Sequence, residues 1–306
     1  LSWASALLSG VLLVMCLGWL LLNRATRSAY REALRASLDR RELGADVTLD
    51  PALRDELLSR IRDPDPLRAM AAASLLAEFP DGLQRAIDGL VAHPERELRR
   101  VGLASAARHN QEISAAALRE AVADDEAPAE VRALALARGL VQGEPSAVGR
   151  AAVLGREGDP GAAAALLAHG EPGSTDDADA TVAALVGHDH AERRRDVAAA
   201  LASVPSPRAL PHLLRLVADR DHAVAGAAIP AGPALDDADL WRAVVDRAGD
   251  TPLWPTVAAA LSEGGADVAR ILTEVLGDPP RDRHAGPRLA KALVRIDDEA
   301  AVATIL

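Results

Sequence analysis

The sequence predicts an all-α protein in which an N-terminal apolar helix precedes an α-solenoid of helix-turn-helix repeats. Three observations predict this fold class. Residues 1–23 carry no charged side chain and are mostly apolar. From residue 51 onward, breaks rich in Asp, Pro and Gly recur about every 30 residues. Between these breaks, apolar residues follow the i, i+3, i+4, i+7 spacing of amphipathic helices.

The apolar segment is long enough for a transmembrane helix, since about 20 residues at a rise of 1.5 Å cross a hydrocarbon core of ~30 Å. A signal peptide is the alternative, but it has basic residues before its apolar core and small residues at its cleavage site. Here bulky Leu20, Leu21 and Leu22 occupy that place, and the basic residues come afterwards. We expect aromatic and basic side chains to mark the membrane interface. These are Trp3, Trp19, Arg24, Arg27 and Arg31.

Residues 24–50 are expected to form a basic juxtamembrane helix and a linker. Residues 24–41 contain six Arg against Glu32 and Asp39, a net charge of +4. The positive-inside rule then places residues 24–306 in the cytoplasm, with the chain held in the cell inner membrane. The chain opens on the apolar run without Met, and residues 297–306 read as the start of another helix. Both features predict a piece of a longer protein.

Composition limits the classes of partner. Removing the +4 of residues 24–41 from the net charge of −11 leaves −15 for residues 42–306, which argues against nucleic acid. Aromatic residues are 2% of the chain, too few for platforms that stack bases. Cys16 is the single cysteine, so the sequence excludes a disulfide framework and a thiolate metal cluster.

Residues 51–306 are expected to form seven to nine repeat units, each a first helix, a tight turn and a second helix. The turns are expected at residues 63–66, 93–95, 124–126, 158–160, 188–190, 219–221, 249–250 and 278–280. In the sixth unit, the first helix presents Leu210, Leu213, Leu214 and Val217. Asp219–Asp221 turn the chain, and the second helix faces back with Val224, Ala227 and Ala228.

Three early units share a signature at the start of the second helix. It comprises an apolar residue that packs inward, an Arg that reaches the acidic turn before it, and a small residue that allows close approach. The three examples are Leu67-Arg68 with Ala71, Leu98-Arg99 with Gly102, and Val131-Arg132 with Ala135. This pattern resembles the short bacterial HEAT repeats of about thirty residues. The resemblance implies stacked repeats that bind proteins or peptides, normally on the face lined by the second helices.

The pattern departs from this resemblance at three places. The sixth unit has Ala225 where Arg is expected, and the fourth unit, around residues 145–170, is the least regular. The polar stretch at residues 170–177 is expected to be a loop between units, the alternative being a modified or recognised loop.

A second resemblance lies at residues 30–41, YREALRASLDRR, which follow the apolar helix and lead into the repeats. This junction resembles the tail of bacterial transporters of the major facilitator or nucleotide-translocase type that carry cytoplasmic HEAT repeats. The resemblance implies that transport occurs upstream of residue 1 and that the repeats regulate or dock. Residues 30–41 include no transport-site residue.

The search for chemistry finds no phosphate-binding loop, dinucleotide motif, nucleophile elbow or HExxH motif. His188-Asp189-His190 offers too few ligands for a credible metal site. The acidic runs at residues 124–126 and 236–239 lack the pattern of a calcium loop and are expected to cap helices. A likeness to phycobilin lyases would make the chain an enzyme, but Cys16 lies in the apolar span. We therefore expect no catalytic activity, cofactor, metal or small-molecule substrate.

The remaining candidate site is a surface for a protein or peptide partner. Five arginines on expected second helices are the least ordinary charges of an acidic array, and an acidic segment could pair with them. They are Arg99, Arg100, Arg193, Arg194 and Arg195. The alternative is that they pair with turn acids of their own repeats or lie on solvated helix faces. Trp241 and Trp254 are expected to pack together in the core of the seventh unit rather than to form an exposed anchor.

The sequence therefore predicts a membrane-anchored HEAT-like scaffold, the regulatory or docking tail of a transporter-like protein. Two alternatives stay open: a single-pass anchored adaptor, and the non-catalytic part of an enzyme or ligand sensor whose active domain lies elsewhere.

Overall fold

The computed structural model describes residues 51–77, 79, 82–277, 285–294 and 296, which are helical and contain no β-strand. The α-helices are α2 (Pro51–Ile61), α3 (Pro66–Ala77), α4 (Gly82–Val91), α5 (Arg96–Arg108), α6 (Ala115–Ala123), α7 (Ala129–Gln142), α8 (Pro145–Arg156), α9 (Pro160–His169), α10 (Pro172–Val186), α11 (Ala191–Ser203), α12 (Leu210–Val217), α13 (His222–Ala228), α14 (Gly232–Leu235), α15 (Ala238–Asp246), α16 (Trp254–Glu263), α17 (Ala266–Gly277) and α18 (Ala285–Leu293). Three short 3₁₀ helices are η1 (Pro207–Ala209), η2 (Ile229–Ala231) and η3 (Arg247–Gly249).

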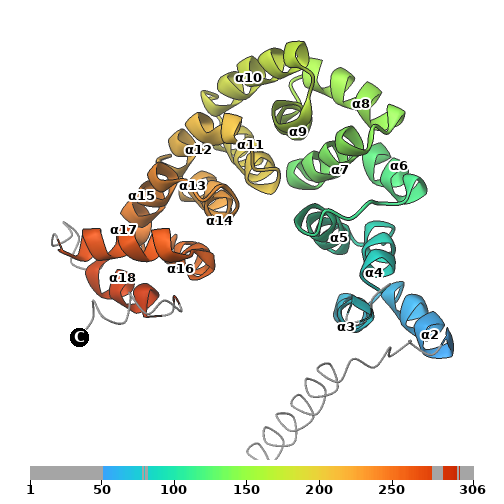
Figure 1. The fold of residues 1–306 in the computed structure, drawn as a ribbon. Helices are drawn as coiled ribbons and strands as arrows, with labels where there is room; N and C mark the ends of the chain where they lie inside the picture. The colour runs from blue at the N-terminus through green and yellow to red at the C-terminus, as the bar shows by residue number, and fades with distance from the viewer. Residues whose placement is uncertain (1–50, 78, 80–81, 278–284, 295, 297–306) are drawn as a thin grey trace, which may run out of the picture. The chain divides into compact units, whose positions relative to one another are not determined.

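Consecutive helices form helix-turn-helix pairs that stack in two layers (Figure 1). In the described part of the chain the pairs, numbered first to eighth, are α2/α3, α4/α5, α6/α7, α8/α9, α10/α11, α12/α13, α15/α16 and α17/α18. The first helices contact one another in succession, and so do α5, α7, α9, α11 and α13 among the second helices. The prediction of an all-α, repeat-like protein is confirmed, and the arrangement is compatible with an α-solenoid.

The predicted breaks lie at the turns inside the pairs. For example, the turns between α2 and α3, α4 and α5, and α12 and α13 fall at residues 62–65, 92–95 and 218–221. The break at residues 278–280 lies outside the described residues.

Acidic side chains cap α9 and α13, whose N-cap residues are Asp159 and Asp221. Asp221 Oδ1 accepts the backbone N–H of Ala223 at 2.8 Å. The predicted cap in the run at residues 236–239 is confirmed, since Asp237 Oδ1 accepts the N–H of Asp239 at 2.9 Å. The predicted cap in the run at residues 124–126 was wrong, because α7 begins after Pro128 and Asp124 instead accepts the N–H of Glu126 within the turn.

The prediction of a loop over residues 170–177 was wrong, because α10 begins at Pro172. Proline suits the first turn of a helix, where its missing N–H would have no helical partner. Thr175 then closes this turn, since its hydroxyl donates to the carbonyl oxygens of Gly170 at 3.1 Å and Glu171 at 2.9 Å. The stretch is polar because it begins a helix, and the chain continues into the next pair with a two-residue connection.

The inward orientation predicted for Leu67 was also wrong, since its side chain is 81% exposed. The cause is a shift in register. Arg99 and Arg132 lie four residues after their N-cap residues, whereas Arg68 lies three residues after Asp65, which precedes α3. The residue equivalent to these arginines in the first pair is therefore Ala69, which is fully buried. Leu67 and Arg68 consequently face away from the core.

Small residues allow the helices to approach closely at two of the three signature positions, since Gly102 and Ala135 are buried. Ala71 is exposed, because the same shift in register turns it away from the core. A Cβ at Gly102 would lie 2.9 Å from the Cβ of Leu90 and from the backbone nitrogen of Val91. The same principle shapes α9, whose residues 160–167 are all buried. This helix contacts α7, α8, α10 and α11, and its first six residues are Pro, Gly and Ala, whose small side chains let these neighbours pack closely. In the irregular fourth pair, α9 is therefore enclosed, whereas α8 buries only Ala147 and Ala151.

The core of the sixth pair follows the predicted pattern in part. The buried residues include Leu213 and Val217 on α12 and Val224 and Ala228 on α13, as predicted. Leu210, Leu214 and Ala227 are half-buried and pack at the margin of the core. Leu216 and Ala225 are buried in addition.

The two tryptophans of the seventh pair have different neighbours. Trp241 is fully buried, lies against Gly232, and donates its Nε1–H to Asp236 Oδ1 at 2.9 Å. Trp254 is half-buried, and the guanidinium carbon of Arg288 lies 5.6 Å from its ring centroid. Both rings therefore contribute to packing, each against its own partner.

The predicted transmembrane helix at residues 1–23 and the basic segment at residues 24–50 lie outside the described residues. Within the described part, every helix is too short or too polar to cross a bilayer. The membrane-interface residues therefore remain a prediction.

Candidate partner-binding site

Three arginines occupy one structural position at the turn edge, the edge of the array formed by the turns inside the pairs. Arg99, Arg132 and Arg194 each lie four residues after the N-cap residue of a second helix. Each extends toward the turn of the next pair, where an aspartate accepts it. We call this series of ion pairs the ladder.

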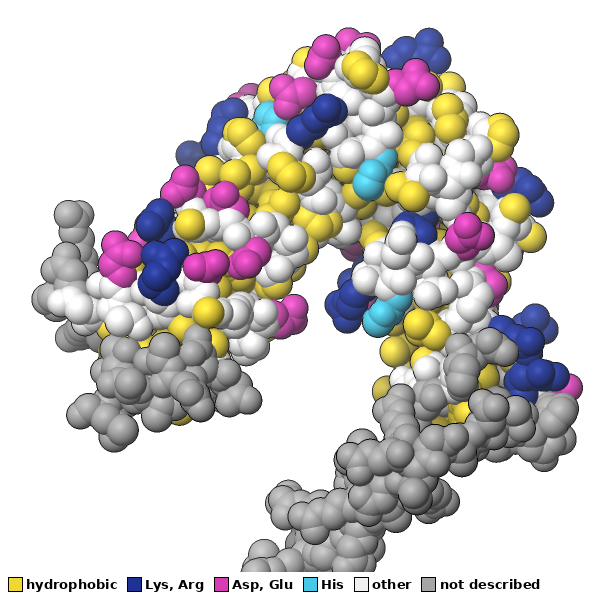
Figure 2. Space-filling view, viewed as in Figure 1, with side chains coloured by type: hydrophobic (Ala, Val, Ile, Leu, Met, Phe, Trp, Pro, Cys, Tyr) yellow, Lys and Arg dark blue, Asp and Glu magenta, His cyan; other side chains and the backbone are white. Residues whose placement is uncertain are grey.

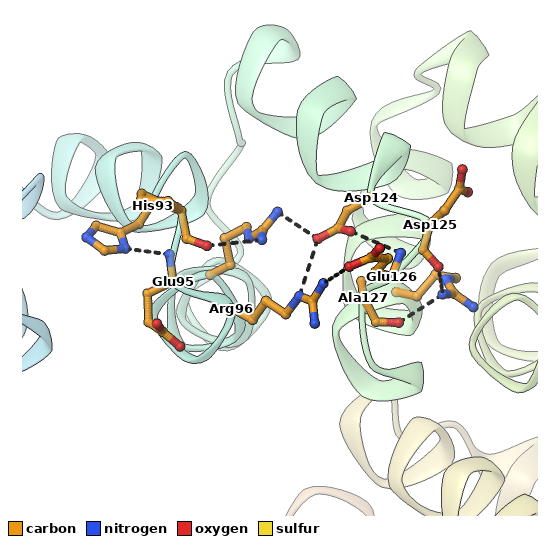
Figure 3. A network of polar contacts seen from close by, with 10 residues as sticks. His93, Glu95, Arg96, Asp124, Asp125, Glu126 and Ala127 are labelled. Atoms are coloured by element: carbon orange, nitrogen blue, oxygen red, sulfur yellow. Dashed lines mark hydrogen bonds and ion pairs between the residues drawn. The ribbon is translucent and has the colours of Figure 1, made fainter. Parts of the chain in front are cut away.

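The first two rungs of the ladder link the second, third and fourth pairs. Arg99 Nη1 lies 3.0 Å from Asp124 Oδ2. Arg132 pairs with Asp159, and its Nη2 donates to the carbonyl oxygens of Asp125 and Ala127, both at 2.8 Å. Figure 3 shows the surroundings of Asp124, which also lies 4.0 Å from Arg96 Nε. Arg96 in turn donates to Glu126 at 2.8 Å.

The third rung is the most complete. Arg194 donates to Asp219 through Nε at 2.7 Å and through Nη2 at 3.1 Å, a bidentate pair. Its Nη1 donates to the carbonyl oxygens of His188 at 2.8 Å and Asp189 at 3.0 Å. The hydrogen bonds to the Asp219 carboxylate raise the pKa of Arg194. Burial raises the pKa of Asp219, but the bonds from Arg194 and from the Asp221 N–H outweigh it, so the pKa of Asp219 is lowered.

The ladder position holds alanine in three other pairs, namely Ala69, Ala163 and Ala225. In the pairs after Ala69 and Ala163, the acceptor aspartate is replaced by His93 and His188. His93 Nδ1 accepts the N–H of Glu95 at 2.9 Å, so its Nε2 carries the proton and donates to the Asp63 carbonyl at 3.2 Å. His188 Nδ1 likewise accepts the N–H of His190 at 3.1 Å. Histidine thus completes a turn that receives no arginine from the preceding pair.

The five arginines predicted to bind a partner have three different surroundings. Arg99 and Arg194 pair with turn acids, but these acids belong to the next pair and not to the same repeat, where the alternative placed them. Arg100 is half-buried and pairs with Glu97 on its own helix, where the bond raises the pKa of Arg100 and lowers that of Glu97. Arg193 and Arg195 are exposed on α11, and Arg195 contacts the adjacent Asp196 at 3.2 Å. A binding role for these five arginines stays a prediction.

A polar pocket of 390 Å³ lies beside the third rung, where α10 and α12 end. It is lined by Val186, Gly187, His188, Asp189, Arg194, Arg215, Asp219 and Arg220. Arg215 and Arg220 are exposed, and no carboxylate of a described residue lies within ion-pair distance of either. The sequence interpretation missed both, because the pocket is formed by two successive turns that lie about 30 residues apart.

Basic and acidic side chains are interspersed on the face drawn in Figure 2, over the first helices as well as the second. In the part of the chain that the structure covers, no group of three or more His, Cys, Asp or Glu side chains could hold a metal ion. The pocket at the turn edge is lined mainly by charged side chains, three of which are arginines.

Comparisons with known proteins found no family, no curated protein and no solved structure that matches this chain. The class that the fold defines is a helical, repeat-like all-α protein.

Proposed function

We propose that this chain is a HEAT-like α-solenoid that binds a protein or peptide partner and performs no catalysis of its own. The repeat length of about 30 residues, the two layers of helices and the arginine signature at the second helices support the HEAT assignment. Repeats that contact only their neighbours expose a long surface, and such surfaces typically bind other polypeptides.

One observation carries the proposal: Arg193 and Arg195 are exposed beside a buried arginine on the same helix. Arg194 is 7% exposed and anchors the ladder, so α11 is held in place from within. Its two sequence neighbours extend into solvent from a chain with a net charge of −11. A partner with an acidic segment would gain charge-assisted hydrogen bonds there, on an array that otherwise repels it.

Charge reversal at these two positions tests the proposal. The unmodified chain is used to capture a partner from the cells in which the protein occurs. We expect the variant Arg193→Glu/Arg195→Glu, with Arg194 retained, to capture about tenfold less of this partner or still less. The control is Arg85→Glu/Arg108→Glu, which makes the same charge change at two exposed arginines of the second pair. Equal capture by the two variants, at either the high or the low level, would contradict the role assigned to α11.

We also propose that residues 1–23 anchor the chain in the inner membrane and that residues 24–306 lie in the cytoplasm. In the favoured setting, the array is the regulatory or docking tail of a transporter-like protein. The uncharged apolar run followed by a net charge of +4 supports this proposal. We expect the full chain to stay with membranes after alkaline extraction and a chain without residues 1–23 to be released. Release of both chains would contradict the anchor.

A further inference from the structure

We infer that the pocket formed by the turns of the fifth and sixth pairs binds an anionic side chain of the partner, a carboxylate or a phosphate. This inference rests on the proposed function and names a site and a chemistry for it. The guanidinium groups of Arg215 and Arg220 would bind the anion, and the Arg194–Asp219 ion pair lines the same pocket.

The Arg194–Asp219 ion pair that lines the pocket is electrically balanced. Arg194 makes four hydrogen bonds, two to the Asp219 carboxylate and two to carbonyl oxygens of the preceding turn. Its charge is therefore already neutralised, and four of its five N–H donors are used. An incoming anion would meet the other charges of the pocket, which are Arg215, Arg220 and the carboxylate of Asp189. Two cations against one anion leave an excess of positive charge in the pocket.

Comparison of equivalent positions shows that the sixth turn differs from the others. Arg215 lies four residues before the ladder acceptor Asp219, and Arg220 lies one residue after it. The same two positions at the other ladder acceptors are Glu120/Asp125 in the third pair and Gly155/Pro160 in the fourth. At the corresponding turns of the first, second and fifth pairs they are Ser59/Pro64, Gly89/Pro94 and Ala184/Asp189. None of these residues is basic, and in the third pair both are acidic. The ladder therefore does not require arginine at either position.

Helix electrostatics explain only part of this difference. Arg215 lies in the last turn of α12, where a cation complements the negative end of the helix dipole. Arg220 lies in the turn itself and has no such role. Elsewhere at the turn edge, arginines such as Arg96 and Arg247 contact a carboxylate at 2.8 Å. Arg215 and Arg220, with no carboxylate of a described residue within ion-pair distance, supply at this pocket the forked donors that carboxylate and phosphate groups accept in bidentate geometry.

Fluorescence anisotropy of labelled peptides with the full chain tests the site. The probes are an octaglutamate peptide, a phosphoserine peptide of equal charge, and an octaglutamine peptide as the neutral control. We expect both anionic peptides to bind and the neutral peptide not to bind. The ratio of the two anionic affinities identifies the preferred group. Arg215→Glu/Arg220→Asp gives the sixth turn the residues of the third, so the ladder should still form, and we expect about tenfold weaker binding.

The control Arg85→Glu/Arg108→Glu should bind within about twofold of the unmodified chain, because a shared field alone is screened within ~8–10 Å. Equal loss in both variants would overturn the inference, since binding would then follow net charge. Failure of both anionic peptides to bind the unmodified chain would also overturn it. If the anionic peptides do not bind but partner capture still depends on Arg193 and Arg195, the pocket inference fails and the proposed function stands. If the peptides bind but partner capture does not depend on Arg193 and Arg195, the role proposed for α11 fails and the pocket inference stands.

Discussion

Replacing Trp241 by alanine will destabilise the array by about 3–5 kcal/mol, the cost typical of removing a buried large aromatic side chain. The ring is fully buried, packs against Gly232, and donates a hydrogen bond to Asp236 at 2.9 Å. The cavity that remains would be lined by helices of two pairs, and a stacked array has no other core to compensate for it. The denaturation midpoint of the full chain, followed by circular dichroism, measures the effect.

Two further variants separate packing from the hydrogen bond. Trp241→Phe fills most of the volume but leaves Asp236 without its indole donor, so its loss should be smaller than that of Trp241→Ala. Trp254→Ala should also cost less, because Trp254 is half-buried and its ring lies beneath Arg288. A midpoint for Trp241→Ala equal to that of the unmodified chain would show that the seventh pair does not pack as described.

The second large effect is expected at the ladder. Arg132→Ala should cost about 2–3 kcal/mol, because it removes the partner of Asp159 and the donor to two carbonyl oxygens. The two side chains of this rung are 15% and 12% exposed, so water replaces these bonds only in part. Hydrogen exchange of residues 124–163 should rise more than that of distant pairs, since each rung joins two neighbours.

A double-mutant cycle isolates the rung itself. Asp159 also caps α9 through the N–H of Ala162 at 2.8 Å, and Asp159→Asn retains that acceptor while it removes the charge. We expect a coupling energy of about 1–2 kcal/mol between Arg132→Ala and Asp159→Asn. Additive effects of the two substitutions would show that the ion pair contributes nothing beyond its separate hydrogen bonds.

Much of the fold could be predicted from sequence because its determinants are local. The turns follow from Asp, Pro and Gly, and the helices between them from apolar spacing. The predictions of a loop at residues 170–177 and of an inward Leu67 were wrong because, in each case, a single residue determines where the helix begins. Pro172 begins a helix although its surroundings are polar, and an N-cap one residue nearer turned Leu67 and Arg68 away from the core. A motif of two letters cannot show which residue is the cap.

The candidate site was less predictable, because its contacts join residues of different pairs. Arg193, Arg194 and Arg195 are adjacent in sequence and chemically identical, but of the three Arg194 is the one that pairs with an aspartate of another pair, 25 residues further along the chain. Arg215 and Arg220 carry no motif at all. Arg215 and Arg220 stand out only when equivalent positions of the turns are compared, and that comparison requires knowing which residues of each pair are equivalent.

The most direct test of the account is a hydrogen-exchange footprint of the full chain with and without the octaglutamate peptide. The proposed binding surface predicts slower exchange in residues 186–195 and 215–221, with the first to third pairs unchanged. The same footprint should disappear in Arg215→Glu/Arg220→Asp. Slower exchange confined to other pairs, or none while the peptide is bound, would contradict the assignment of partner binding to the fifth and sixth pairs.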